Sequence, residues 1–215
     1  RLNVKTIHIH ESYSSSPLTH DLALLELSTP VNSNKANWIP WQTNIHLPLD
    51  GTEIKTAGWG STAAGENIKE IDLREAPGSI LFNPGTNRCG FWSTFDPSQW
   101  LCVGGEEKIG SCLGDGGGPV TTGSVLPVLQ GVIAWGPEGD CASTRLPNVA
   151  VRVSTYDDWI SQRVGNPWIK AEGITWFNHA IKNLQTGQNY TFFVTAHDQL
   201  GRQSESVPVN ITVKD

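Results

Sequence analysis

The segment from Gly110 to Pro119 constrains the fold more than any other part of the sequence. It reads Gly-Ser-Cys-Leu-Gly-Asp-Gly-Gly-Gly-Pro, a composition that on its own predicts only a flexible turn. Its interpretation changes because four further segments stand around it in a definite order. These are residues 21–25 (Asp-Leu-Ala-Leu-Leu), 56–60 (Thr-Ala-Gly-Trp-Gly), 131–136 (Gly-Val-Ile-Ala-Trp-Gly), and 147–153 (Pro-Asn-Val-Ala-Val-Arg-Val) followed by Trp159 and Ile160.

Together these segments resemble those of the trypsin/chymotrypsin-like serine proteases, and the resemblance covers residues 1–164. Residues 114–119 match the family hallmark Gly-Asp-Ser-Gly-Gly-Pro with one change. The other segments resemble the strand that supplies the triad Asp, the linker into the second barrel, the strand that lines the substrate cleft, and the closing strand with the C-terminal helix. The resemblance implies an all-β fold, a chymotrypsin-like antiparallel double barrel whose first barrel is incomplete.

The catalytic triad that the resemblance implies is not complete in this chain. In such enzymes a Ser oxygen attacks the acyl carbon, a His takes its proton and a buried Asp orients the His. Asp21 matches the triad Asp, whereas the nucleophile position is Gly116, which has no side chain. The family's His lies upstream of the matched segments, and Ala134 replaces a Ser that usually hydrogen-bonds the Asp. We therefore expect a catalytically inactive homologue.

Three histidines near Asp21 offer alternative chemistry. His20 directly precedes Asp21, and adjacent side chains of a strand point to opposite faces, so we expect His20 not to serve as the base. His8 and His10 share one face of a predicted strand, which allows a surface metal site as an alternative. We favour a structural role for both, because His10 resembles a family His at a strand end without catalytic duty. We expect no metal and no cofactor.

Two predicted features of the site do not depend on a nucleophile. By the resemblance, the backbone N–H groups of Gly114 and Gly116 match an oxyanion hole, which needs donors rather than side chains. Asp115 matches the carboxylate that pairs with a new N-terminal amine in activated enzymes of the family. We expect Asp115 to have another partner in this chain, or one from a further segment or chain.

The resemblance also assigns the positions of a substrate pocket. Gly110 matches the pocket base, where trypsin-like members keep an Asp, and Asn148 matches a wall position that carries a carboxylate in some relatives. Because both positions are uncharged here, we expect a weak preference for Arg or Lys. The occupant that we expect is a protein or peptide segment. The predicted substrate-binding residues are Gly110, Ser111, Leu113, Trp135, Gly136 and Asn148.

Four cysteines form an even set without the close Cys-x-x-Cys spacing of a zinc site. This pattern predicts two disulfides and an oxidising compartment, and so a secreted protein. The resemblance implies the pairs Cys89–Cys102 and Cys112–Cys141. The second pair would tie the Gly-rich segment to the wall of the pocket.

Composition excludes several other classes of protein. The chain of 215 residues is 38% hydrophobic and 17% charged, which is typical of a globular protein. A net charge of −6 argues against nucleic acid as a partner, and no apolar run is long enough for a membrane span. The sequence contains no Met. We therefore expect that Arg1 is not the first residue of the gene product, and that a segment or chain completes the first barrel.

Hydrophobic patterns predict the main elements. Strands are expected at residues 4–9, 21–27, 53–59 and 128–135. The last of these is nearly continuously apolar, a pattern typical of a strand that is buried on both faces. A helix is expected at residues 154–164, with Ser154 as its N-cap and Tyr156, Trp159 and Ile160 on one face.

The sequence Gly165-Asn-Pro167 marks a boundary, and residues 168–215 differ in character. Alternating segments at 190–196 and 207–213 resemble the second half of a fibronectin type III module, a small immunoglobulin-like β-sandwich. By this resemblance Tyr190 would form a tyrosine corner. Trp168 and Trp176 allow a sugar-binding platform as an alternative to a packed core.

Three functional hypotheses follow from these patterns. The first is a secreted pseudoprotease that binds a protein or peptide in its cleft. The second is a fragment or inactivated form of an active secreted serine endopeptidase. The third is an extracellular adhesion or carbohydrate-binding module that uses the protease fold as a scaffold.

Overall fold

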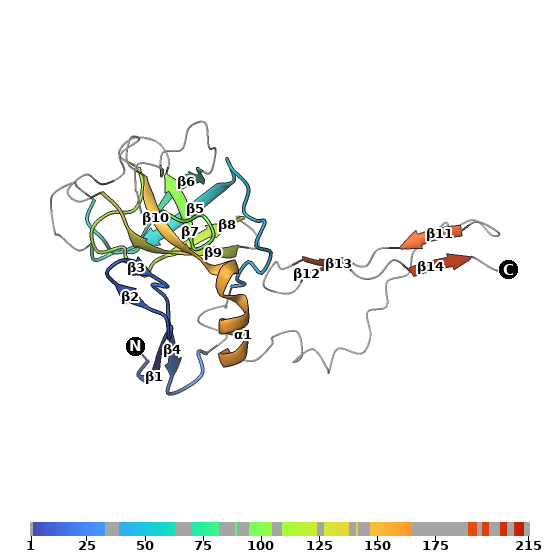
Figure 1. Cartoon of the computed structure of the whole chain (residues 1–215), viewed down its shortest axis with the longest axis horizontal. Helices are drawn as coiled ribbons and strands as arrows, with labels where there is room; N and C mark the ends of the chain where they lie inside the picture. The colour runs from blue at the N-terminus through green and yellow to red at the C-terminus, as the bar shows by residue number, and fades with distance from the viewer. Residues whose placement is uncertain are drawn as a thin grey trace.

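A computed structural model of the chain places its elements in space (Figure 1). The residues that it describes are 2–32, 39–62, 70–81, 89, 95–104, 109–123, 127–137, 141, 147–164, 189–192, 195–197, 203–205 and 209–212.

Six antiparallel strands close into a barrel, in the spatial order β10-β7-β6-β5-β8-β9 (Figure 1). This closed barrel, with one short helix after it, confirms the predicted all-β, trypsin-like architecture. The strands at residues 53–59 and 128–135 were predicted from their pattern, and the structure places them within a residue of the expected bounds. The strands are β5 (Glu53–Gly58), β6 (Arg74–Ile80), β7 (Trp100–Gly104), β8 (Pro119–Thr122), β9 (Val128–Trp135) and β10 (Asn148–Arg152).

Apolar side chains from every strand fill the barrel interior. On β5, Ile54 and Thr56 are buried whereas Glu53 and Lys55 are exposed, as expected for a strand with one face on a core. The strands that are buried on both faces are β7 and β10, not β9 as the sequence pattern predicted. The residues that form the interior cluster are Ile54, Ile80, Leu101, Val103, Val120, Ile133 and Ala150.

A second core lies between the outer face of β7 and β10 and the C-terminal helix. A 3-10 turn, η3 (Val153–Tyr156), leads into helix α1 (Asp157–Val164). Tyr156, Trp159 and Ile160 are buried together, which confirms the face predicted for them. The prediction that Ser154 caps the helix is wrong, because Ser154 lies buried inside the 3-10 turn and α1 begins three residues later.

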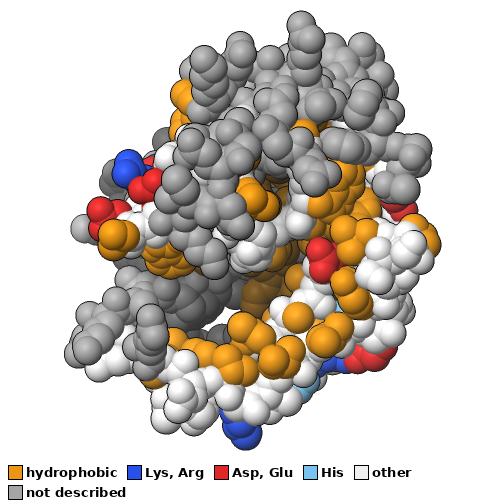
Figure 2. Space-filling model, turned by 90° about the vertical axis from the view of Figure 1, so that its left-hand side faces the viewer, with side chains coloured by type: hydrophobic (Ala, Val, Ile, Leu, Met, Phe, Trp, Pro, Cys, Tyr) orange, Lys and Arg blue, Asp and Glu red, His pale blue; other side chains and the backbone are white. Residues whose placement is uncertain are grey.

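The N-terminal residues form a small open sheet. Strand β1 (Val4–Ile9) pairs with β4 (Ala23–Leu27), and the short strands β2 (Ser14–Ser15) and β3 (Leu18–Thr19) form a hairpin between them. Ile7 stands opposite Leu25 in this sheet, and both side chains are more than half exposed. In Figure 2 hydrophobic side chains gather beside a hollow in the lower part of the molecule, where Figure 1 places β1 and β4.

Four strands are described in the C-terminal segment. Strand β11 (Asn189–Phe192) pairs with β14 (Val209–Thr212), and β12 (Thr195–His197) pairs with β13 (Gln203–Glu205). The predicted tyrosine corner rests on the Tyr190 side chain, and the sugar platform rests on Trp168 and Trp176. These side chains lie outside the described part of the structure, so both remain predictions.

Candidate functional site

A cleft of about 580 Å³ opens beside the Gly-rich segment. It brings together both predicted oxyanion residues, one of which, Gly116, is the predicted nucleophile position, and five of the six predicted substrate-binding residues. The walls come from the loop before β8, the end of β9 and the start of β10. The described lining residues are Ser111, Cys112, Leu113, Gly114, Gly116, Ile133, Ala134, Trp135, Gly136, Pro137, Cys141 and Asn148.

Backbone hydrogen bonds within the loop and to strand β9 hold the loop that carries Gly116. The N–H of Gly117 donates to the carbonyl of Ile133 at 2.8 Å, and the N–H of Gly118 donates to the carbonyl of Asp115 at 2.8 Å. A positive φ of 97° at Gly114 gives the loop a conformation that glycine adopts readily. A Cβ added at Gly116 would meet nothing nearer than the Ala134 carbonyl oxygen, 4.0 Å away. A serine at this position is therefore sterically acceptable.

Asn148 lines the cleft, and its side chain is hydrogen-bonded to Ser111. Its Nδ2 donates to the carbonyl oxygen of Ser111 at 2.9 Å and to the Ser111 hydroxyl at 2.8 Å. Ser111 is buried, whereas Trp135 lies half-buried on the wall and packs edge-on against Trp100. Gly110, the predicted pocket base, is not among the described lining residues of the cleft, but it lines the cavity of Asp115 and a small cavity that Ser111 and Asn148 also line.

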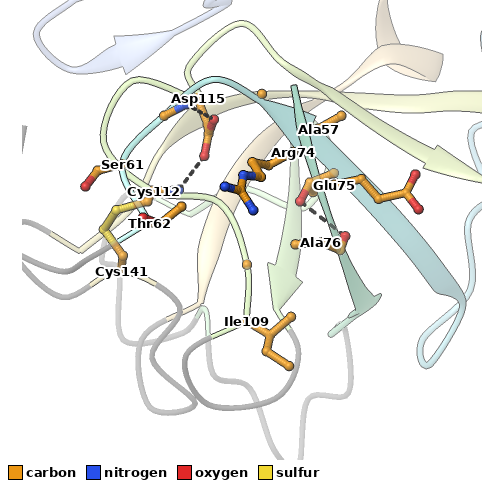
Figure 3. Close-up of a pocket in the computed structure, with 14 residues that line it drawn as sticks. Ala57, Ser61, Thr62, Arg74, Glu75, Ala76, Ile109, Cys112, Asp115 and Cys141 are labelled. Carbon is orange, nitrogen blue, oxygen red and sulfur yellow. Dashed lines mark hydrogen bonds between the residues drawn. A yellow bond between two sulfur atoms is a disulfide. The ribbon is translucent and has the colours of Figure 1, made fainter. Parts of the chain in front are cut away.

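Asp115 lines a second cavity of about 440 Å³, which shares Cys112 and Cys141 with the lining of the cleft. Its carboxylate accepts hydrogen bonds from the backbone N–H groups of Gly60 and Cys112, each at 2.8 Å (Figure 3). These two backbone N–H groups are the partners of Asp115, which the sequence alone did not identify. A Cβ at Gly60 would lie 2.6 Å from the carboxylate, so the contact requires glycine. Figure 3 also shows Arg74 among the residues that line the cavity. The Arg74 guanidinium forms an ion pair with Glu70 at 3.3 Å.

Asp21, which matches the triad Asp, is not among the lining residues of the cleft. It sits in a tight turn before β4, where the N–H of Leu22 donates to the carbonyl of His20 at 2.7 Å. Burial raises the pKa of the Asp21 carboxyl. Within the described part of the chain its carboxylate has no hydrogen bond or ion pair.

His20 does not pair with Asp21, but the predicted reason was incorrect. The two residues precede β4 rather than lying within it, and His20 has a positive φ of 50°. The His20 ring instead stacks on that of His10, with centroids 4.8 Å apart, and its Nδ1 lies 3.3 Å from the Tyr156 hydroxyl. Burial, followed by the neighbouring charge of His20, lowers the pKa of His10. Burial also raises the pKa of Tyr156 to about 12.

Contacts of Glu11 with Trp159 and Arg163 hold the N-terminal sheet to α1. The Trp159 indole N–H donates to Glu11 at 2.7 Å, and the Arg163 guanidinium pairs with Glu11 and lies 4.2 Å from the Trp159 ring centroid. In the described ranges, no three His, Cys, Asp or Glu side chains converge as metal ligands. The His8 and His10 pair thus remains without a third ligand among these residues.

Both disulfides join the cysteines that the family resemblance paired, Cys89 with Cys102 and Cys112 with Cys141. The second bond connects two walls of the cleft, because Cys112 and Cys141 both line it. Among the described helices, none is long and apolar enough to cross a membrane.

The sequence prediction missed several residues of the two cavities. Ile133 and Pro137 line the cleft beside residues that were predicted, and Arg74 lines the cavity of Asp115. Pro137 directly follows the predicted cleft residues Trp135 and Gly136, so its place in the lining could have been predicted from the sequence. Arg74 lies on β6, whose sequence contains Pro77 and Gly78. This sequence lacks the alternation that predicts a strand, so Arg74 was not recognised as a cavity residue.

Comparison with known proteins agrees with this geometry. The sequence model of the Trypsin family matches residues 1–160. Chymotrypsin-C of Rattus norvegicus is 30% identical over 166 residues, which cover 75% of this chain and 61% of that protein. Inactive CLIP domain-containing serine protease A3 of Aedes aegypti is 31% identical over 172 residues, covering 75% of this chain and 35% of that protein.

Among solved structures, neuropsin, a serine protease expressed in the limbic system of mouse brain, has the same fold. Its TM-score is 0.66 at 23% identity, and the match covers 76% of this chain and 71% of that one. The chain thus spans less than two thirds of the length of the chymotrypsin-C proteins that it matches. The barrel, the paired cysteines, the cleft beside the Gly-rich loop and the match over residues 1–160 place this chain in the trypsin family of serine protease homologues.

Proposed function

We propose that this chain is a catalytically inactive serine protease homologue that binds a protein or peptide segment in its cleft. The observation that carries the proposal is Gly116, which stands at the nucleophile position of a cleft that is otherwise formed. Without a side-chain oxygen at this position there is no covalent attack on a peptide bond. Loss of the nucleophile in such enzymes lowers the rate by about a factor of 10⁶.

The cleft supports a binding role because its shape does not depend on a nucleophile. Backbone hydrogen bonds hold the loop of Gly116, and a disulfide holds two of the walls. The N–H groups of Gly114 and Gly116 have no acceptor within the described residues, so they are available to a carbonyl of a bound peptide. Backbone donors of this kind are what an oxyanion hole requires.

The proposal also includes the surroundings of the cleft. The two disulfides favour an oxidising compartment, so we place the protein outside the cell. The exposed apolar side chains of Ile7, Ile9 and Leu25 favour a further β segment that covers the sheet β1–β4 and completes the first barrel. The strand pairs of residues 189–212 favour the fibronectin type III-like module.

Peptide capture tests the binding role. The full chain is immobilised and exposed to a random peptide library, and bound peptides are eluted and sequenced by mass spectrometry. We expect a subset of intact peptides that the variant Trp135→Ala no longer retains, because Trp135 forms a wall of the cleft. Trp59→Ala, at an exposed position outside the cleft lining, is the control. Equal retention by wild type and Trp135→Ala, or no retention at all, would contradict the proposal.

A second candidate function is that of a serine endopeptidase inactivated by one substitution. The open space around Gly116 favours it, because a serine there meets no atom within 4.0 Å of its Cβ except one carbonyl oxygen at that limit. We expect Gly116→Ser in the complete gene product, with any upstream segment present, to cleave a chromogenic peptide amide. A folded but inert Gly116→Ser protein would leave the binding role as the better account.

A further inference from the structure

Two sequence motifs for N-linked glycosylation stand in the C-terminal segment. The motif is Asn, then any residue except Pro, then Ser or Thr. The chain meets it at residues 189–191 (Asn-Tyr-Thr) and 210–212 (Asn-Ile-Thr). None of the other asparagines, including Asn148 beside the cleft, is followed by Ser or Thr two residues later. The candidate acceptors are therefore confined to the segment that follows the barrel.

The structure places these two motifs opposite each other. Strand β11 pairs antiparallel with β14 (Figure 1), with Asn189 opposite Thr212 and Thr191 opposite Asn210. Every second residue of a strand lies on the same face, and residues directly opposite each other share a face. All four residues therefore lie on one face of the strand pair, which we call the Asn–Thr face.

The opposite face of the same strand pair is apolar. Its positions are Tyr190 opposite Ile211 and Phe192 opposite Val209. An antiparallel sheet with one apolar and one polar face commonly packs the apolar face on a core and leaves the polar face in water. We therefore expect the Asn–Thr face to be open to solvent, where a bulky and solubilising glycan is accommodated.

A glycan on this face is compatible with the pairing of the strands. Backbone N–H and C=O groups form the ladder between β11 and β14, whereas a glycan is joined to the side-chain nitrogen of Asn. Asn189 and Asn210 are diagonal neighbours across the pair, a relation in which residues lie about 7–8 Å apart. A glycan on either residue therefore covers the same patch.

We propose that the Asn–Thr face is a site of N-linked glycosylation, with Asn189 and Asn210 as the acceptors. This inference goes beyond the role of the cleft and rests only on the proposed location outside the cell, because such glycans are attached to secreted chains. The glycan makes this face a solvent-facing surface of the segment rather than an interface. Residues 1–164 contain no such motif, so the barrel is left without an acceptor of this kind.

The modification is a group transfer from a lipid-pyrophosphate-linked oligosaccharide, catalysed by a transferase of the secretory pathway. The amide nitrogen of Asn forms a bond to C1 of the first N-acetylglucosamine. The bond between that C1 and the phosphate oxygen breaks, and the lipid pyrophosphate leaves with the electron pair. The amide nitrogen releases one proton to solvent, so the transfer needs neither an oxidant nor a reductant.

Production of the full chain in an insect-cell line tests the proposal. The chain is fused to a cleavable secretion signal and purified from the medium and the secretory membranes together. Its intact mass is measured before and after peptide N-glycosidase, which in ¹⁸O-water leaves a labelled Asp at each acceptor. We expect a loss of mass on treatment of the native chain, with label at positions 189 and 210 across the population of chains.

Matched substitutions of the two threonines identify the acceptors. Thr191→Ser keeps a hydroxyl and should keep the label at Asn189, whereas Thr191→Val has nearly the same shape without a hydroxyl and should lose it. Thr212→Ser and Thr212→Val make the same comparison for Asn210. The double variant Thr191→Val/Thr212→Val should show no loss of mass. Val and Thr both favour strands, so these changes do not oppose the pairing of β11 with β14.

Three outcomes would contradict the proposal. The first is a wild-type chain with both disulfides formed but no loss of mass on treatment. The second is label that persists in the double variant, which would place the glycan elsewhere. The third is a glycan that the enzyme removes only after denaturation, which would contradict a solvent-facing Asn–Thr face. Peptide capture on the same preparation reports separately on the binding function, which stands or fails independently of the glycan.

Discussion

The six-stranded barrel and the two-stranded sheet β1–β4 have similar alternating sequences but bury their side chains to different extents. In the barrel, Ile80 and Leu101 have no exposed surface. In the sheet, Ile7 and Leu25 are 61% and 57% exposed, although they face each other across paired strands. The barrel closes on itself, so each strand has two neighbours, whereas within the described residues β1 and β4 pair only with each other.

The difference shows which part of the molecule stabilises the cleft. The Gly-rich loop, β9 and β10 belong to the closed barrel, so the cleft rests on a well-packed core. Asp21 lies in the turn before β4 of the open sheet. This part of the chain is joined to η3 and α1 by contacts of Glu11, His10 and His20. The predicted binding residues thus belong to the well-packed barrel, whereas the predicted triad Asp lies beside the less buried sheet β1–β4.

The largest expected effect comes from equivalent substitutions in the two regions. Leu101→Ala in the barrel should lower the free energy of unfolding by about 2–5 kcal/mol, because it leaves a cavity in a packed core. Leu25→Ala, the same change in the open sheet, should alter it by less than about 0.5 kcal/mol. Urea unfolding followed by tryptophan fluorescence measures both, and similar losses for the two variants would contradict the comparison.

A second prediction concerns the disulfide that joins the walls of the cleft. Replacing Cys112 and Cys141 together by Ala should lower the free energy of unfolding by about 2–4 kcal/mol, as expected for a bond that spans 29 residues. Peptide capture should be weakened as well. Replacing Cys89 and Cys102 is the control, because that bond does not line the cleft and should reduce stability without a direct effect on capture.

A third prediction concerns the anchor of the Gly-rich loop. Gly60→Ala places a methyl group 2.6 Å from the Asp115 carboxylate, so the carboxylate must move and lose a backbone hydrogen bond. We expect a loss of about 1–3 kcal/mol in unfolding free energy, with shifted amide signals at Gly114 and Gly116. Gly116→Ala is the steric control for stability, since a Cβ there meets nothing nearer than the Ala134 carbonyl oxygen at 4.0 Å. An unchanged loop in Gly60→Ala would show that Asp115 does not anchor it.

The smallest expected effect is a pH dependence of the contact between the sheet and α1. Burial and the charge of His20 lower the pKa of His10, to which Arg163 also contributes, while Glu11 acts in the opposite direction. The unfolded chain therefore binds a proton more readily than the folded one. The stabilisation is fully present above about pH 6.5 and is lost as the pH falls through the lowered pKa of the folded state.

Urea unfolding at pH 7.5 and pH 5.5 measures this effect. The wild type should lose more stability between the two values than the variant His10→Gln, which has no group to protonate at this position. His46→Gln, at an exposed position of the barrel side, should behave as the wild type. An identical loss in His10→Gln would exclude His10 as the source.

The sequence predicted the cleft better than the open sheet, and the reasons are physical. The Gly-rich loop, Trp135, Gly136 and Asn148 form local segments with fixed roles in the family, so their positions followed from the motif. The hydrogen bond between Asn148 and Ser111 did not follow, because it joins residues 37 positions apart. The pattern of Ile7 and Ile9 predicted a strand correctly but not that its apolar face is exposed, since alternation alone does not show what covers a face.

Strand β9 illustrates the same limit. Its nearly continuous apolar sequence predicted burial on both faces, yet Ala134 and Trp135 line the open cleft. An apolar strand that borders a binding cleft and an apolar strand inside a core have the same sequence pattern. Strands β7 and β10 are the ones covered on both faces, by the barrel interior and by the cluster around Tyr156 and Trp159.

The most direct test of the central claim, a formed cleft without a nucleophile, is hydrolysis of a chromogenic peptide amide by the purified wild-type chain. The assay uses uncharged and basic residues before the scissile bond and runs with and without a covalent serine protease inhibitor. The account predicts hydrolysis no faster than the buffer blank in every case, because Gly116 has no oxygen to attack the carbonyl. Hydrolysis that the inhibitor abolishes would contradict the account, because it would require a reactive serine elsewhere in the chain.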